Sequence, residues 1–202
     1  MGYLANKVLN SDISNLKSIG DNNVIINCVF MGDGIEVGNN CTITNTIIRE
    51  NTCITDSHIV DCVIGESCNI GPYSRLRNDC SIGNGCRIGN FVEIKKSTLK
   101  NGVKVAHLSY IGNAVIGENT NIGCGVVFAN YNGKTKSDII VGKDCFVGSN
   151  STLIAPIKIA DDTYICAGTV VTKSTKNGDF VIGRVRAEIK DDYAYYKKNK
   201  LK

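Results

Sequence analysis

Residues 89–112 bring together several side chains of types that could do chemistry. This stretch contains Glu93, Lys95, Tyr110 and His107, and His107 is one of only two histidines in the chain. An imidazole titrates near pH 6.5 when unperturbed, so His107 could act as a general base near neutral pH. The question is which elements bring these groups together.

Those elements are set by a six-residue repeat. Aliphatic residues recur at every sixth position, with two one-residue slips and one insertion. The eighteen repeat starts are Ile64, Ile70, Leu76, Ile82, Ile88, Ile94, Leu99, Val105, Ile111, Ile116, Ile122, Phe128, Val141, Val147, Leu153, Ile159, Ile165 and Val171. A small residue often stands four positions after a start, so both positions are expected to point inward. Glycine directly follows a start at Gly65, Gly71, Gly83, Gly89, Gly117, Gly123, Gly142 and Gly148, which predicts corners with positive φ.

A six-residue repeat predicts short strands wound into a triangular coil. Three strands make a coil of 18 residues, and parallel strands of successive coils lie about 4.8 Å apart, so about ten coils form a prism roughly 48 Å long. The predicted fold class is an all-β parallel β-helix with one inserted loop. We expect residues 1–20 to be an irregular cap, 1–185 to form the β-helix domain and 186–202 to form a basic tail or short helix.

The composition of the chain argues against several classes of protein, namely membrane, secreted and metal-binding proteins. No apolar run approaches the roughly 18 residues that a membrane helix needs, and no secretory signal is visible, which predicts a soluble cytoplasmic protein with no membrane partner. The ten cysteines include no C-x-x-C pair and follow the repeat, so they are expected to be buried filling, with no metal. The basic last twenty residues suit an anionic partner or a solvated end, and we expect no nucleic-acid partner.

The length of the coil predicts which residues are neighbours in space, because residues 18 apart in the sequence, or 17 apart across a slip, stand one above the other in successive coils. Arg77 and Lys95 are then two cations about 4.8 Å apart on one face. A phosphate between them would remove their repulsion, although two solvated side chains that splay apart would also be stable. Glu93 and Tyr110 also stack, and are expected to end their strands at one corner.

A second column runs along one edge of the prism over roughly 14 Å. It contains His107, Cys124, Ser149 and Ala167, which occupy the same position in successive coils. An imidazole with small residues above it would line a groove for a long, thin ligand. The alternative, that small residues simply recur in repeats, accounts for the upper three positions and leaves the histidine unexplained.

The insertion ANYNGKTKSDII, residues 129–140, adds about seven residues to an otherwise regular array. Loops that interrupt solenoids usually carry function. This loop is expected to project from the prism, where it could cover a site on this chain or on another. Its polar residues are Asn130, Tyr131, Lys134 and Lys136.

Several motifs together resemble one family. GPYSRLR, GNFVEIKKSTL, KVAHLSYIG, NIGCGVVFANYNG, FVGSNSTLIAP and AGTVVTK resemble the acetyltransferase half of the bacterial bifunctional glucosamine-1-phosphate N-acetyltransferase / N-acetylglucosamine-1-phosphate uridyltransferase. The similarity runs from about Val24 to Arg184. It implies the left-handed β-helix of the hexapeptide-repeat acyltransferase superfamily and a homotrimer. It also implies N-acetylation of glucosamine-1-phosphate by acetyl-CoA, in UDP-N-acetylglucosamine and cell-envelope precursor synthesis. The glycine-rich loop and metal-binding carboxylates of the uridyltransferase half are not present in this sequence.

The resemblance also implies roles for individual residues. His107 is the expected catalytic base, with Glu93 supporting the reacting groups. The residues expected to bind the sugar phosphate are Arg77, Lys95, Tyr110, Asn121 and Lys136. Those expected to bind acetyl-CoA are Cys124, Asn130, Tyr131, Ser149, Ala167 and Arg184. The family usually has alanine at the position of Cys124, so the backbone N–H is the expected contact there.

Three other functions stay open. A zinc enzyme of the γ-carbonic anhydrase type needs three histidines, whereas this chain has His58 and His107 nearly three coils apart. A non-catalytic domain for assembly would require no particular residue at position 107. Acetyl transfer to another amino or hydroxy sugar would use the same base.

Overall fold

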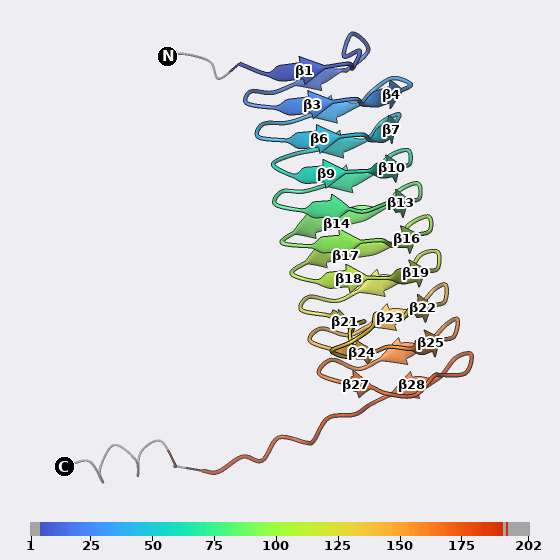
Figure 1. Cartoon of the computed structure of the whole chain (residues 1–202). Coiled ribbons are helices and arrows are strands. Elements are labelled where there is room, and N and C mark those ends of the chain that lie inside the picture. The colour runs from blue at the N-terminus through green and yellow to red at the C-terminus, as the bar shows by residue number, and fades with distance from the viewer. Residues whose placement is uncertain (1–4, 192, 194–202) are drawn as a thin grey trace, which may run out of the picture.

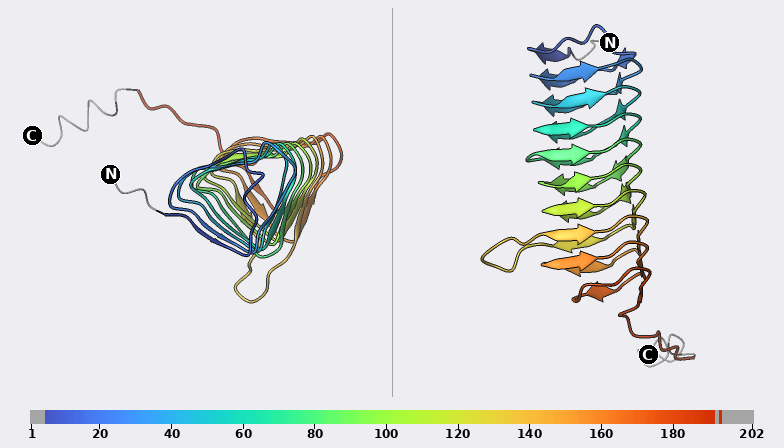
Figure 2. Two further views of the ribbon diagram at one scale, coloured as in Figure 1. Left: turned by 90° about the horizontal axis from the view of Figure 1, so that it is seen from above. Right: turned by 90° about the vertical axis from the view of Figure 1, so that its right-hand side faces the viewer.

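The computed structural model describes residues 5–191 and 193, and Figure 1 shows short strands stacked along one axis. The strands belong in turn to three parallel sheets, and each sheet forms one face of a triangular prism (Figure 2). Two of the faces contain ten strands each, which confirms the predicted number of coils. The arrangement matches a left-handed parallel β-helix.

We name the faces A, C and B in the order in which the chain visits them in each coil. Face A contains β1 (Lys7–Leu9), β3 (Val24–Ile26), β6 (Thr42–Thr44), β9 (His58–Val60), β12 (Arg75–Arg77), β15 (Glu93–Lys95), β18 (Tyr110–Gly112), β21 (Val127–Ala129), β24 (Thr152–Ile154) and β27 (Val170–Val171). Face C contains β4 (Val29–Met31), β7 (Ile47–Arg49), β10 (Cys62–Ile64), β13 (Cys80–Ile82), β16 (Thr98–Leu99), β19 (Ala114–Ile116), β22 (Ile139–Val141) and β25 (Ile157–Ile159). Face B contains β2 (Ser18–Ile19), β5 (Glu36–Val37), β8 (Cys53–Ile54), β11 (Asn69–Ile70), β14 (Arg87–Asn90), β17 (Lys104–His107), β20 (Asn121–Ile122), β23 (Phe146–Val147), β26 (Tyr164–Ile165) and β28 (Phe180–Val181).

The core follows the repeat because side chains alternate between the two faces of each strand. All eighteen predicted starts are buried, with an exposed fraction of at most 3%. Eight of the ten cysteines are buried, as expected for small filling residues, while Cys53 is half-buried and Cys124 is exposed. Burial raises the pKa of the Cys28 and Cys41 thiols, which keeps these two in the neutral form.

The prediction that repeat glycines turn the corners is wrong for most of them. Of the nine glycines that follow a start, Gly112 included, only Gly71 has a positive φ, of 106°. The corners are turned mainly by Asn and Asp, such as Asn45 (φ 49°) and Asp61 (φ 54°), whose side chains tolerate this region. Gly89 is small for another reason, since a Cβ there would overlap the backbone carbonyl oxygen of Ala106 in the next coil.

The two ends of the chain differ from each other. β1 pairs with β3 and β2 pairs with β5, so the first coil forms within the segment predicted to be an irregular cap. At the other end β28 finishes at Val181, and the chain leaves the prism (Figure 1). Residues 182–190 contain neither helix nor strand, and most of the predicted C-terminal helix lies outside the described residues. In the part of the chain that the structure describes, no helix is long and apolar enough to cross a membrane.

The insertion leaves the edge between faces A and C. Ala114 pairs with Ile139, a step of 25 residues where a coil takes 18, so the loop adds the predicted seven residues. An isolated antiparallel bridge between Tyr131 and Lys136 closes it into a hairpin. Figure 2 shows this loop protruding from one corner of the triangle.

Candidate functional site

Four of the predicted residues lie together on face A. Arg77 pairs in register with Lys95, and Glu93 pairs with Tyr110, so two columns stand side by side. The guanidinium of Arg77 donates to Oε1 of Glu93 from Nε at 2.9 Å and from Nη2 at 2.5 Å. Glu93 therefore offsets the charge of Arg77, which was expected to be unpaired. Glu93 and Tyr110 begin their strands, whereas the sequence predicted that they end them.

The inserted loop contributes to the same face. Lys136 lies beside Lys95, and its ammonium group is the main cause that lowers the pKa of Lys95, with Arg77 adding to the effect. Two neighbouring ammonium groups repel each other, and this repulsion destabilises the protonated form of each. Three cations thus surround one region of face A with a single carboxylate, Glu93, which is already bonded to Arg77. Such a region is suited to a phosphate dianion.

Gly112 is a site residue that sequence reasoning missed. It stands above Lys95 in the column of outward-facing positions, and a Cβ there would overlap the hydroxyl group of Tyr110 and the side-chain amide of Asn130. The absence of a side chain lets the Tyr110 ring lie across face A, towards the inserted loop. The signal in the sequence is a glycine one coil above the two stacked cations Arg77 and Lys95.

Asn130 holds the base of the loop. The prediction that it projects from the prism is wrong, because its exposed fraction is only 5%. Its Nδ2 donates to Oδ1 of Asn113 at 2.9 Å, and its carbonyl accepts from the N–H of Ser137 at 2.8 Å. Tyr131 does project, with an exposed fraction of 58%, and its hydroxyl donates to the carbonyl of Gly133. Asn130 therefore positions the hairpin that carries Tyr131.

The predicted column forms the edge between faces B and A. The strand register places Cys124 above His107, Ser149 above Cys124 and Ala167 above Ser149. Hydrogen bonds of 2.8–2.9 Å between the backbones of successive coils run directly beside these four positions. All four side chains reach the surface, with Ser149 half-buried and the others exposed. No side-chain hydrogen bond holds the His107 imidazole within the described residues.

Two backbone N–H groups on this edge are open to a ligand. At four equivalent turns the N–H two positions after a strand-end aliphatic residue is capped by Asn or Asp of the next coil, as at Glu66 by Asn84 (3.0 Å). Cys124 and Ser149 occupy this position, but the residues above them are Ser149 and Ala167, which are too short to cap. Among the described residues these two N–H groups have no partner, so they can donate to carbonyl oxygens of a bound molecule.

Arg184 joins the far end of the column. Its Nη1 donates to the carbonyl oxygen of Ala167 at 2.9 Å, after the chain has left the last strand. The cation is thereby fixed at the end of the edge that begins with His107. An extended ligand along the column would meet the imidazole at one end and a guanidinium at the other.

The structure does not bring every predicted residue together within one chain. Asn121 lies on the outer side of face B, three residues before Cys124, whereas Tyr110 lies on face A. Tyr131 belongs to the hairpin at the edge between faces A and C, on the other side of face A from His107. Across residues 5–191 and 193, no group of three or more His, Cys, Asp or Glu side chains is placed to hold a metal ion.

Comparisons with known proteins bear on this arrangement. Two family models match: bacterial transferase hexapeptide (six repeats) over residues 61–96, and hexapeptide repeat of succinyl-transferase over 138–173. The bifunctional protein GlmU of Chromobacterium violaceum is 43% identical over 177 residues, 85% of this chain and 39% of that protein. GlmU of Clostridium kluyveri is 39% identical over 175 residues, 84% of this chain and 38% of that protein.

This chain spans about two fifths of the length of these curated relatives. Among solved structures, a UDP-N-acetylglucosamine acyltransferase of Francisella novicida matches at 15% identity and a TM-score of 0.46, over 85% of this chain and 62% of that one. A likeness at that level says nothing about substrate or activity. The chain therefore carries the hexapeptide repeat of bacterial transferases, and it is related to the acetyltransferase part of the bifunctional GlmU proteins.

Proposed function

We propose that this chain is an acetyl-CoA-dependent N-acetyltransferase that acts on glucosamine-1-phosphate. One observation carries the proposal: an accessible histidine and two open backbone N–H groups share an edge that borders a cationic face. The GlmU relatives and the resemblance of motifs such as EIKK and AHLSY support the same activity.

The cationic region of face A is proposed to bind the phosphate of the acceptor. Lys95, Lys136 and Arg77 would each donate to phosphate oxygens, and their mutual repulsion would be relieved when the dianion binds. Tyr110 lies between this region and the edge with His107, where it would contact the sugar ring. Asn121 is on another face, so its contact with the sugar requires a second chain.

His107 is proposed to act as the general base. An amine attacks a thioester only through its lone pair, so the ammonium form of the amino sugar must first lose a proton. His107 takes a proton from the nitrogen as the N–C bond forms, and the C–S bond then breaks, so the acetyl group passes directly to nitrogen and the CoA sulfur is released and protonated. The N–H of Cys124 would stabilise the negative oxygen of the tetrahedral intermediate.

The acetyl donor is proposed to lie along the edge between faces B and A. The pantetheine part of acetyl-CoA is long, thin and rich in carbonyl groups, which suits the open N–H groups of Cys124 and Ser149. Arg184, fixed on Ala167, would then meet a phosphate of the nucleotide end. Ten free cysteines are typical of a reducing compartment, which supports a cytoplasmic location for the reaction.

The donor site is proposed to be closed by another copy of the chain, in a homotrimer. The edge is convex, and Tyr131 and Asn121 lie on surfaces from which they cannot reach His107 of the same chain. Next to the column, Tyr73, Phe91 and Leu108 are 58–62% exposed and have positive φ values of 38–59°. Bulky residues are costly in that region of backbone space, so we infer that they are retained for contact with a neighbouring chain.

The acceptor can be tested by measuring CoA release with glucosamine-1-phosphate and a panel of other amino and hydroxy sugars. Glucosamine-1-phosphate is expected to give the highest kcat/KM, and unphosphorylated glucosamine a much lower value. Preference for another acceptor would redirect the proposal to that sugar, and no CoA release with any of them would leave a non-catalytic assembly domain as the better reading.

The shared site can be tested by mixing two impaired variants. His107→Ala and Arg184→Ala chains would be dissociated together, reassociated and assayed, since closed homo-oligomers exchange equivalent subunits. If sites are shared, some mixed sites contain both wild-type residues, and activity rises clearly above the sum of the separately treated variants. No recovery, with mixed trimers shown to have formed, would mean that both residues serve a site from one chain.

A further inference from the structure

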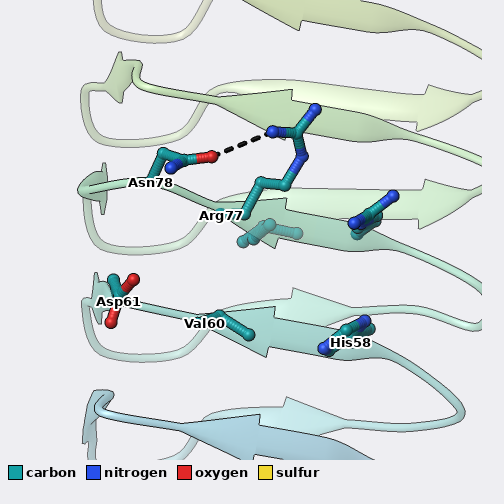
Figure 3. Close-up of a pocket in the computed structure, with 7 residues that line it drawn as sticks. His58, Val60, Asp61, Arg77 and Asn78 are labelled. Atoms are coloured by element: carbon teal, nitrogen blue, oxygen red, sulfur yellow. Dashed lines mark hydrogen bonds between the residues drawn. The ribbon is translucent and has the colours of Figure 1, made fainter.

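A hollow lies on face A, one coil below the proposed phosphate position. Its volume is about 280 Å³, and the outward side chains of β9 and β12 frame it. Figure 3 shows Arg77 and Asn78 above, with His58, Val60 and Asp61 on the neighbouring coil. None of the roles proposed above uses the groups in this hollow except that of Arg77, which forms its upper wall.

One end of the hollow is cationic. Arg75 pairs in register with His58, so the two side chains leave adjacent strands about 4.8 Å apart and on the same side of the sheet. Arg77 uses three of the five N–H donors of its guanidinium on Glu93 and on Oδ1 of Asn78. The side chain of Arg75, in contrast, is exposed, and its guanidinium makes no hydrogen bond or ion pair within the described residues. Its planar array of N–H donors, together with the imidazole, is therefore free to bind an oxyanion.

The other end of the hollow has a different polarity. Asp61 accepts one hydrogen bond, from Nδ2 of Asn45 at 2.9 Å, and its second carboxylate oxygen has no partner among the described residues. Asn78 uses its oxygen for Arg77, which leaves its amide group as a donor. Val60 forms a small apolar floor between the two ends. The hollow therefore fits a ligand with an anion at one end and hydroxyl or amino groups at the other.

We propose that this hollow binds a small phosphorylated molecule of the size of a sugar phosphate, with its phosphate on Arg75 and His58. The hydroxyl or amino groups of the ligand would donate to Asp61 and accept from Asn78. Arg77 connects this site to the reaction site, since the same guanidinium holds Asn78 in the hollow and Glu93 above it. The inference concerns binding alone and stands apart from the acetyl transfer proposed above.

The two histidines make the test direct. Protein labelled with 13C in its imidazole rings gives two histidine signals, and His58→Gln identifies the one from His58. Inorganic phosphate is then titrated at constant pH and ionic strength. We expect a saturable shift of the His58 signal, with affinity about tenfold weaker in Arg75→Gln, as for loss of one charge-assisted pair. Arg87→Gln, an exposed arginine on face B, is the matched control and should bind as the wild type does.

Two further variants separate this hollow from the reaction site and test its other end. Lys95→Met should leave the His58 response intact, and Asp61→Asn should weaken glucosamine-1-phosphate without weakening inorganic phosphate. An unsaturated, linear response of His58 in the wild type overturns the proposal. So does a response that Lys95→Met abolishes and Arg75→Gln does not change, because the anion would then bind only at the reaction site, and the proposed function would stand.

Discussion

The same turn occurs on two edges of the prism, but the two edges differ in whether a side chain caps one backbone N–H group of that turn. On the edge between faces C and B, the N–H groups of Glu66, Asn84 and Lys143 are capped at 2.8–3.0 Å by Asn or Asp side chains of the next coil. On the edge between faces B and A, the equivalent N–H groups of Cys124 and Ser149 have no partner within the described residues. The difference lies in the residue above, which is small on the second edge.

The comparison shows how a repetitive scaffold can acquire a site by losing side chains. A carboxamide in the next coil closes the turn, whereas serine or alanine leaves a donor exposed at a fixed height along the prism. At each of these positions the residue directly above decides whether the N–H is capped. Capping is therefore set locally and does not depend on which edge of the prism the turn belongs to. The N–H of Asn101, which lies under Glu118, also lacks a partner among the described residues, but no histidine accompanies it.

The largest expected effect tests the residue that distinguishes the second edge. His107→Ala should lower kcat by a factor on the order of a hundred or more, the usual contribution of a general base. The fold should be unchanged, because the imidazole is exposed and makes no hydrogen bond within the described residues. Turnover at saturating concentrations of both substrates is the measurement, with circular dichroism and molecular mass as controls. Near-normal turnover of the folded variant would remove His107 from the mechanism.

The second effect follows from converting the open edge into the capped one. Ser149→Asn places a carboxamide above Cys124 in the same position from which Asn84 caps Glu66. The capped N–H can no longer donate to the acetyl donor or to the negative oxygen of the tetrahedral intermediate, so kcat/KM for acetyl-CoA should fall about tenfold or more. Ser149→Ala is the matched control, since it leaves the N–H open.

Steady-state kinetics with varied acetyl-CoA would separate these outcomes. An equal change of kcat/KM in Ser149→Asn and Ser149→Ala would show that the serine hydroxyl, and not the backbone N–H below it, contacts the donor. No change in either variant would place the donor elsewhere.

The repeat made most of the fold predictable, because a six-residue period dictates both the burial and the register of every coil. The column of His107, Cys124, Ser149 and Ala167 followed from counting alone. What counting could not supply was the direction and partner of each side chain. The pairing of Arg77 with Glu93 depends on rotamers, and the burial of Asn130 depends on how an irregular loop closes on Asn113.

The glycine positions were misread for a related reason. Sequence shows that a residue is small but not whether the backbone needs a positive φ or the next coil needs space. In this prism Asn and Asp provide the left-handed conformation, and most repeat glycines provide the space.

The third effect concerns the cationic face beside the open edge. Lys95→Ala should raise the KM for glucosamine-1-phosphate about tenfold, with little change in the KM for acetyl-CoA. In the wild type the neighbouring Lys136 ammonium lowers the pKa of Lys95 from its usual 10.5. Binding of the acceptor should therefore weaken as pH rises through this lowered pKa, because Lys95 then loses its charge.

Two measurements check the sign of this effect. Lys136→Met should raise the pKa of Lys95, followed by NMR of labelled lysine side chains, because it removes the main cation that opposes protonation. A bound phosphate should raise it as well, because an anion stabilises the ammonium form. Equal sensitivity of glucosamine and glucosamine-1-phosphate to Lys95→Ala would contradict a phosphate-binding role.

The smallest effect is expected on the capped edge, and it reverses the second experiment. Asn84→Ser removes the carboxamide that caps the N–H of Glu66 and so opens this turn as Ser149 opens the turn at Cys124. The turn is exposed and water can replace the lost partner, so the free energy of unfolding should fall by only about 0.5–1 kcal/mol. Urea unfolding at one fixed protein concentration measures this change, since assembly would otherwise contribute. Both kcat and the KM for acetyl-CoA should remain unchanged, because this edge has no histidine and is not proposed to bind either substrate. Altered kinetics in Asn84→Ser would show that the two edges are coupled and that the difference between them is not local.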